Sequence, residues 1–113
     1  MAAIIVLRHV QSGTVEVTNT AKKLSELEED GSGSNYAVAG HGIRCHMQNL
    51  DEAATIFVAP TSSVVASDAA HQGWRLGPSD VLSLDWPKGD IDGLYFISTT
   101  TGVRMRIWEE SFV

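Results

Sequence analysis

Short runs of alternating polar and apolar residues recur along this chain, separated by turns rich in Gly, Pro and Asp. Alternation places the apolar side chains of a strand on one face, so that this face covers a core while the other meets water. Many short strands at close spacing are typical of sandwiches and barrels. The pattern therefore predicts an all-β protein, a single small jelly-roll-like β-sandwich of about seven to nine short antiparallel strands.

Several segments carry the strand pattern. They are residues 14–18, 43–47, 54–58, 62–66, 80–85, 94–98 and 103–108, of which 62–66 is the weakest. The last two flank Gly102, which is able to adopt a positive φ, and we predict that they form a hairpin.

The stretch 73–86 predicts a structural corner between two strands. Gly73 starts it and Gly77-Pro78 turns the chain, because proline fixes φ and lacks an amide donor. Val81 or the Leu82/Leu84 pair is expected to hold the following strand in the sandwich.

Residues 21–29 depart from the alternation. Leu24 and Leu27 are three positions apart and would share one face of about two turns of helix. The acids at 28–30 would stand at the end of that helix where its dipole disfavours negative charge, and Gly and Ser follow them. We therefore expect a mobile acidic Gly/Ser loop near 28–35 rather than a long helix.

The length of 113 residues predicts one domain. Its expected organisation is an N-terminal arm or edge strand over residues 1–13 and a β-sandwich domain over residues 14–113. The single cysteine, Cys45, excludes an internal disulfide and a cysteine-based metal site.

Charge and hydropathy exclude two classes of partner. The net charge is −6 and the Lys and Arg residues are scattered, whereas nucleic-acid binding needs a concentrated basic patch. No stretch approaches the roughly 20 apolar residues of a membrane span. The apolar start is shorter than the core of a signal peptide, and Arg8 follows it rather than preceding it. We expect a soluble protein made in the cytoplasm, with neither a nucleic-acid nor a membrane partner.

The residues that commonly carry chemistry form no catalytic pattern. The histidines are His9, His41, His46 and His71. In a strand, Cys45 and His46 point to opposite faces, and a metal site needs three or four ligands. The chain contains no G-x-S-x-G nucleophile elbow and no phosphate-binding glycine loop. We expect no catalytic, cofactor-binding or metal-binding residue, no cofactor and no enzymatic activity.

Tryptophans and apolar ends point to a protein partner. Trp74, Trp86 and Trp108 are each expected in the core when taken singly, although tryptophan is also enriched at interfaces. Residues 2–7 and 112–113 are apolar where chains usually turn polar, so we expect them to dock on their own domain or on a neighbouring subunit. The residues expected at a partner interface are Ile4, Ile5, Leu7, Trp74, Trp108 and Phe112.

The order of turns and strands over residues 14–110 resembles small all-β bacteriophage virion proteins of the capsid-decoration or cement type. The matching positions are Gln48-Asn49, residues 56–58, Ser63-Val64, Gly73, Leu76, Gly77-Pro78-Ser79, Leu94-Tyr95 and Gly102-Val103. Two features depart from that pattern. Gly77-Pro78-Ser79-Asp80 replaces a Pro-Gly-Glu-Ser order, and residues 28–35 form an insertion that would alter the exposed surface.

The resemblance implies a β-sandwich on the capsid exterior of a virion, made in the cytoplasm of the host bacterium. It implies binding to the major capsid protein or other virion proteins, and self-association, often as a homotrimer. It carries no catalytic residue. A tail, neck or fibre component, or a receptor-binding module, is the alternative within the virion, and a small cellular ligand-binding domain is the alternative outside it.

Overall fold

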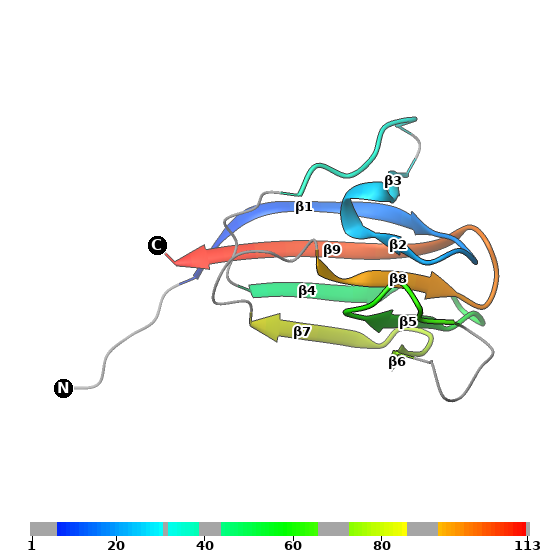
Figure 1. Cartoon of the computed structure of the whole chain (residues 1–113). Coiled ribbons are helices and arrows are strands. Elements are labelled where there is room, and N and C mark those ends of the chain that lie inside the picture. Colours follow the sequence, from blue (N-terminus) through cyan, green and yellow to red (C-terminus); the bar gives the residue numbers. More distant parts are fainter. Residues whose placement is uncertain (1–6, 31, 39–43, 66–72, 86–92, 113) are drawn as a thin grey trace.

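The computed structural model describes residues 7–30, 32–38, 44–65, 73–85 and 93–112, with the side chains of residues 7, 8 and 112 left aside. Within these ranges nine strands form two antiparallel sheets that share one core (Figure 1). No segment of these ranges is α-helical. The predicted all-β sandwich is therefore confirmed.

The larger sheet has five strands and the smaller has four. The larger contains, from edge to edge, β3 (Glu28–Glu29), β1 (Leu7–Val17), β9 (Val103–Phe112), β4 (Arg44–Asn49) and β7 (Val81–Asp85). The smaller contains β2 (Lys22–Lys23), β8 (Tyr95–Ser98), β5 (Ile56–Ala59) and β6 (Trp74–Leu76). One turn of 3-10 helix, η1 (Leu24–Glu26), lies between β2 and β3.

The connectivity is that of a jelly roll. With the two-residue β3 set aside, the larger sheet has the order β1-β9-β4-β7 and the smaller has β2-β8-β5-β6. Successive strands therefore lie in opposite sheets, except for β5 and β6, which are neighbours in the smaller sheet, as in the two Greek keys of a jelly roll. The jelly-roll prediction is confirmed, and the boundary expected between residues 13 and 14 falls inside β1.

Alternation on the long strands builds the core. In β9, Val103, Met105 and Ile107 are buried, while Arg104 and Arg106 are exposed on the other face. Matching side chains from the other strands complete the cluster, among them Val15, Val17, Cys45, Met47, Ile56, Val58, Leu76 and Phe96. The core is thus a layer between two sheets, each contributing every second residue.

The strand predicted at 62–66 is wrong for its described residues. Residues 62–65 form a turn and irregular chain. Val64 packs against Phe57, Ala59 and Ile97 in a second cluster. These side chains explain why β5 is buried on both faces, and a short apolar run that covers a sheet resembles a strand in sequence.

The hairpin predicted from residues 94–98 and 103–108 is also wrong. β8 pairs with β2 and β5, whereas β9 pairs with β1 and β4 in the other sheet. Gly102 does adopt a positive φ of 81°, so the turn is where the sequence places it. The turn carries the chain across the sandwich instead of back along the same sheet.

Residues 21–29 form two short strands and the η1 turn, not a helix. Leu24 and Leu27 share a side, as their spacing predicts, and both are fully buried between the sheets. β3 pairs with β1, and Asp30 lies 3.0 Å from Arg104. Residues 32–35 are the exposed Gly/Ser loop, and hydrogen bonds from Ser32 and Ser34 tie it back to itself.

Candidate protein-docking surface

One long edge of the sandwich is formed by β6 in the smaller sheet and β7 in the larger, and residues 77–80 connect them. The Gly77 amide donates to the Asp80 carboxylate at 2.8 Å, and the Asp80 amide donates to the Gly77 carbonyl at 3.0 Å. Ser79 adopts a φ of 64°, which is uncommon for a residue other than glycine. The predicted corner exists, and this tight turn moves the chain from one sheet to the other.

A buried asparagine holds the corner in place. The Asn49 side-chain amide donates to the carbonyls of Ala54 at 2.9 Å and Leu76 at 3.0 Å. Its side-chain oxygen accepts the amide of Asp51 at 2.8 Å. Because Asn49 is fully buried, these bonds replace the water it has lost and fasten the ends of β4 and β6 together.

Gly73 positions the first residue of β6. A Cβ atom at Gly73 would lie 2.2 Å from the Val58 carbonyl oxygen, a distance at which the backbone would have to move. Glycine therefore allows the chain to approach β5 closely just before Trp74 pairs with Val58. The consequence is that the Trp74 side chain stands at the sheet edge, 66% exposed.

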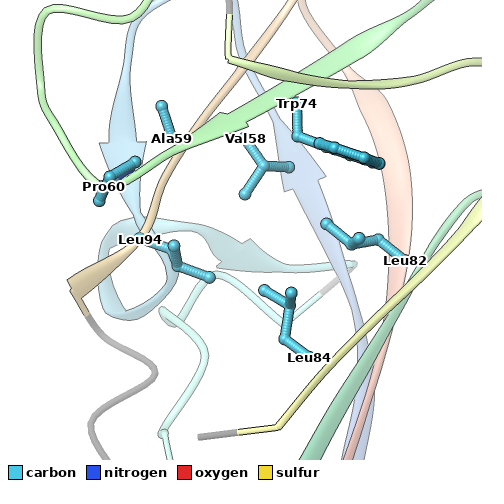
Figure 2. A pocket seen from close by; sticks show the side chains of 7 residues that line it. All are labelled: Val58, Ala59, Pro60, Trp74, Leu82, Leu84 and Leu94. Carbon is cyan, nitrogen blue, oxygen red and sulfur yellow. The ribbon is translucent and has the colours of Figure 1, made fainter.

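An apolar pocket opens between the two edge strands, with a volume of about 340 Å³. Val58, Ala59, Pro60, Trp74, Leu82, Leu84 and Leu94 line it. Figure 2 shows Leu82 and Leu84 of β7 directed toward the side of the pocket that carries Trp74, Val58 and Leu94. The Leu82/Leu84 pair, rather than Val81, faces inward, because Val81 is 58% exposed on the opposite face of β7.

The lining determines what the pocket is able to bind. None of the seven lining residues carries a charge or a side-chain hydrogen-bonding group other than the indole N–H. Such a surface takes apolar side chains through burial and gives no acid, base or nucleophile for a reaction. Exposed tryptophan beside aliphatic side chains is typical of protein-binding surfaces.

The outer face of the larger sheet carries a different set of groups. His46 lies between Ser83 and Glu110, with Nδ1 2.7 Å from the serine Oγ and Nε2 2.6 Å from the glutamate Oε1. The interaction with His46 lowers the pKa of Glu110. Ser83 lies opposite His46 in the register of β7 with β4, and Glu110 lies diagonal to His46 on β9, so the row ties three adjacent strands together.

Trp108 lies on the same outer face. Its side chain is 40% exposed and its ring centroid is 4.2 Å from that of His9. Together with Arg106 and residues 12–14 it borders a hollow of about 260 Å³. This second hollow combines an aromatic surface with a guanidinium and hydroxyl groups, in contrast to the uncharged pocket beside β7.

The structure separates the residues predicted at a partner interface. Trp74 is at the β6 edge and Trp108 is on the outer face of the larger sheet. The expectation that each tryptophan, taken singly, lies in the core is therefore wrong for these two. Leu7 and Phe112 are paired in the β1–β9 ladder. Ile4, Ile5 and Trp86 lie outside the described residues, as do His41 and His71.

Sequence reasoning did not assign Leu82, Leu84, Val58 and Leu94 to a pocket. Alternation in 80–85 shows that Leu82 and Leu84 share a face. The sequence pattern of an edge strand is the same, however, whether other residues cover that face or a pocket opens beside it. Only the arrangement of the two sheets distinguishes these cases.

In the described ranges, no group of three His, Cys, Asp or Glu side chains is placed to hold a metal ion. The same ranges contain no helix long and apolar enough to cross a membrane. No protein-family model, curated protein or solved structure matches this chain.

Proposed function

We propose that this chain is a non-enzymatic structural protein of a bacteriophage virion. In this role it decorates or cements the capsid by binding the lattice of the major capsid protein on the capsid exterior. The observation that carries the proposal is the apolar pocket between β6 and β7, because its lining suits the docking of protein and not catalysis. The ordered resemblance of the turns, given above, supplies the kind of partner.

The fold is compatible with this role without selecting it. Jelly rolls occur in viral capsid proteins, and also in lectins and cupins. Fold does not determine function, so the argument depends on the surface. A cement protein needs a rigid body, apolar surface that self-associates and contact with a lattice, and the first two of these match the core and the pocket edge.

The test is to locate the protein in particles. An antibody against the recombinant protein is used for immunogold labelling of purified virions of the phage that encodes it. Gold over the heads is the expected result, and added protein should raise the melting temperature of heads from which the protein has been stripped. Particles without label, or heads whose melting temperature ignores the added protein, would contradict the proposal.

A tail, neck or fibre component with a receptor-binding role is the second candidate. The hollow beside Trp108 favours it, since an exposed indole with Arg106 and nearby hydroxyls suits a polar ring such as a host glycan. Gold restricted to tails, together with quenching of tryptophan emission by host surface glycans that Trp108→Ala abolishes, would select this candidate. A small cellular ligand-binding domain would remain if no phage particle contains the protein.

A further inference from the structure

We propose that the pocket between β6 and β7 receives residues 2–6 of a second copy of this chain, added as a strand beside β7. The inference deepens the proposed function, because it names the partner that occupies the docking surface when the protein assembles. It also makes the expected homotrimer a product of strand exchange.

The receiving edge combines an apolar recess with a strand that, among the described strands, is paired on one side only. Among the described strands, β7 has a single neighbour, β4, so one side of its backbone is open to pairing. The recess next to it has about 340 Å³, roughly ten times the ~30 Å³ that one water molecule occupies in the liquid. A strand added to such an edge gains backbone hydrogen bonds and places alternate side chains in the recess.

The donated segment matches this edge in chemistry and length. Residues 2–6 read Ala-Ala-Ile-Ile-Val, uncharged and rich in β-branched side chains that favour strands. The segment has as many residues as β7, which spans five. Side chains alternate along a strand, so Ile4 and Val6 share one face and would enter the pocket together.

Distance favours a neighbouring copy over the same chain. β1 begins at Leu7, at the end of the sheet where Arg44 pairs with Asp85, and β9 and β4 separate it from β7. Three strand spacings amount to about 14 Å, whereas six extended residues reach about 20 Å at most. Crossing the end of its own sheet would leave about two residues to lie along β7, while the segment of a second copy has its full length.

Such an exchange has a defined symmetry. The segment of one protomer meets the pocket of the next, which is a head-to-tail contact that closes into a ring when the rotation between copies permits. Each copy then gives one segment and receives one, and the exposed Trp74 becomes covered at every junction.

The experiment crosslinks segment to pocket between two different protomers. One version of the chain carries Cys45→Ala and Ile4→Cys, and the other carries Cys45→Ala and Leu84→Cys with a size tag. They are mixed, allowed to exchange subunits and treated with a short bismaleimide. In the control, Thr100→Cys, an exposed site in the β8–β9 connection, replaces Leu84→Cys.

We expect a tagged–untagged covalent pair at least tenfold more abundant than in the control, with the peptides around residues 4 and 84 joined in its mass spectrum. Light scattering should show the full chain as a trimer and the variant lacking residues 2–6 as a folded monomer. A variant with Ile4 and Val6 both changed to Ser should also be monomeric, which separates loss of burial from loss of length.

Three results would overturn the inference. They are a crosslink yield equal to that of the control, an oligomer that survives deletion of residues 2–6, and, in a third version that carries both Ile4→Cys and Leu84→Cys, a crosslink that forms only within one chain. Particle labelling stays independent of these results. Gold on phage heads together with an intact oligomer after the deletion would reject strand exchange and keep the virion role.

Discussion

At each long edge of the sandwich a short connection carries the chain from one sheet to the other. The η1 turn joins β2 to β3 at one edge, and residues 77–80 join β6 to β7 at the other. The first connection inserts Leu24 and Leu27 between the sheets, and Tyr36 follows them, all three at most 1% exposed. The second inserts no large apolar side chain between the sheets and leaves an open pocket with Trp74 at its rim.

The contrast shows that the jelly roll does not itself require the open edge. A connection of similar length closes the β2–β3 side, and the hydroxyl of Tyr36 donates to the Glu109 carboxylate there at 2.6 Å. At the β6–β7 side the space between the sheets is the apolar pocket, and residues 77–80 do not cover its lining. The closed edge therefore contributes stability, whereas association is the role that we propose for the open edge.

The largest expected effect comes from truncating a leucine at each edge. Leu24→Ala should lower the free energy of unfolding by about 4 kcal/mol, since a fully buried leucine leaves a cavity. Leu84→Ala should cost about 1 kcal/mol, because Leu84 is only partly buried and already borders a pocket. Urea denaturation of monomeric variants lacking residues 2–6 measures both, and equal losses would abolish the distinction between the edges.

The Asn49 side chain should matter nearly as much as Leu24. Asn49→Ala removes two donated bonds and one accepted bond and leaves buried carbonyls of the corner unsatisfied, which should cost about 3 kcal/mol. Gln48→Ala, an outward-facing change at the neighbouring position that removes only an exposed 3.5 Å contact with the Ser79 carbonyl, is the control and should stay within about 0.5 kcal/mol. If the two variants denature at the same urea concentration, the corner does not depend on Asn49.

A smaller effect is expected from Tyr36→Phe at the closed edge. The change removes the hydrogen bond from this hydroxyl to Glu109 and should cost about 2 kcal/mol, because a buried carboxyl group loses a donor. Burial, reinforced by Glu109, raises the pKa of the nearby Cys45 thiol to about 12, so the thiol is protonated at pH 8. The same burial keeps the thiol from contact with reagents in solution.

The reaction of Cys45 with a disulfide reagent reports opening of that edge. We expect slow labelling in the natural chain and labelling at least tenfold faster in Tyr36→Phe under native conditions. Tyr95→Phe makes the same chemical change at a partly buried site on β8, where Tyr95 pairs with Lys23 of β2 and takes no part in the bond to Glu109, and it should leave the rate unchanged. Faster labelling in both variants would indicate global rather than local opening.

The smallest expected effect is a loss of folding stability in acid, caused by three carboxyl groups on or near β7 and β4. The pKa of Asp85 is lowered by its bond to Arg44, that of Glu110 by His46, and that of Asp51 by the amides of Ala54 and Ala53. A lowered folded-state pKa gives stability that is present above the ordinary value near 4 and is lost as pH falls through the folded value.

The thermal midpoint should therefore stay level from pH 7 to about 5 and decline below about 4. Asp51→Asn and Asp85→Asn should each flatten part of that decline. Added salt should weaken the contribution of Asp85 more than that of Asp51, because the Arg44–Asp85 pair is exposed and its attraction is screened. A decline that both variants leave unaltered would place the acid-sensitive groups elsewhere.

Alternation predicted the sandwich because burial on one strand face imposes a period of two. It located the buried faces of β9 and β4. For β7 it left Val81 and the Leu82/Leu84 pair as alternatives, and the structure shows that the pair faces inward. It did not extend β1 back to Leu7, since a register shift between His9 and Gln11 interrupts the alternation there. Alternation also does not predict which strands pair. The polar and apolar pattern of β8 and β9 is the same whether the two strands are neighbours in one sheet or lie in opposite sheets.

The candidate site was predictable only in part. Residue types predicted the Gly-Pro corner. Trp74 lies exposed at the pocket, and its role at an interface stays a prediction. The pocket itself arises because no pair of side chains like Leu24 and Leu27 fills the space between the edge strands β6 and β7. Such a space depends on the distance between the sheets, a quantity that no local pattern contains.

The pairing of β1 with β9 has a consequence for how the molecule responds to force. These strands lie side by side and run antiparallel, with Leu7 opposite Phe112 (Figure 1). Tension applied at these two residues would load the ladder one hydrogen-bonded pair at a time from that end, as in a zipper, instead of shearing all pairs together. The β1–β9 ladder should therefore separate at low force when it is pulled at Leu7 and Phe112. It should resist far more strongly when the force acts along the strands and shears them past each other.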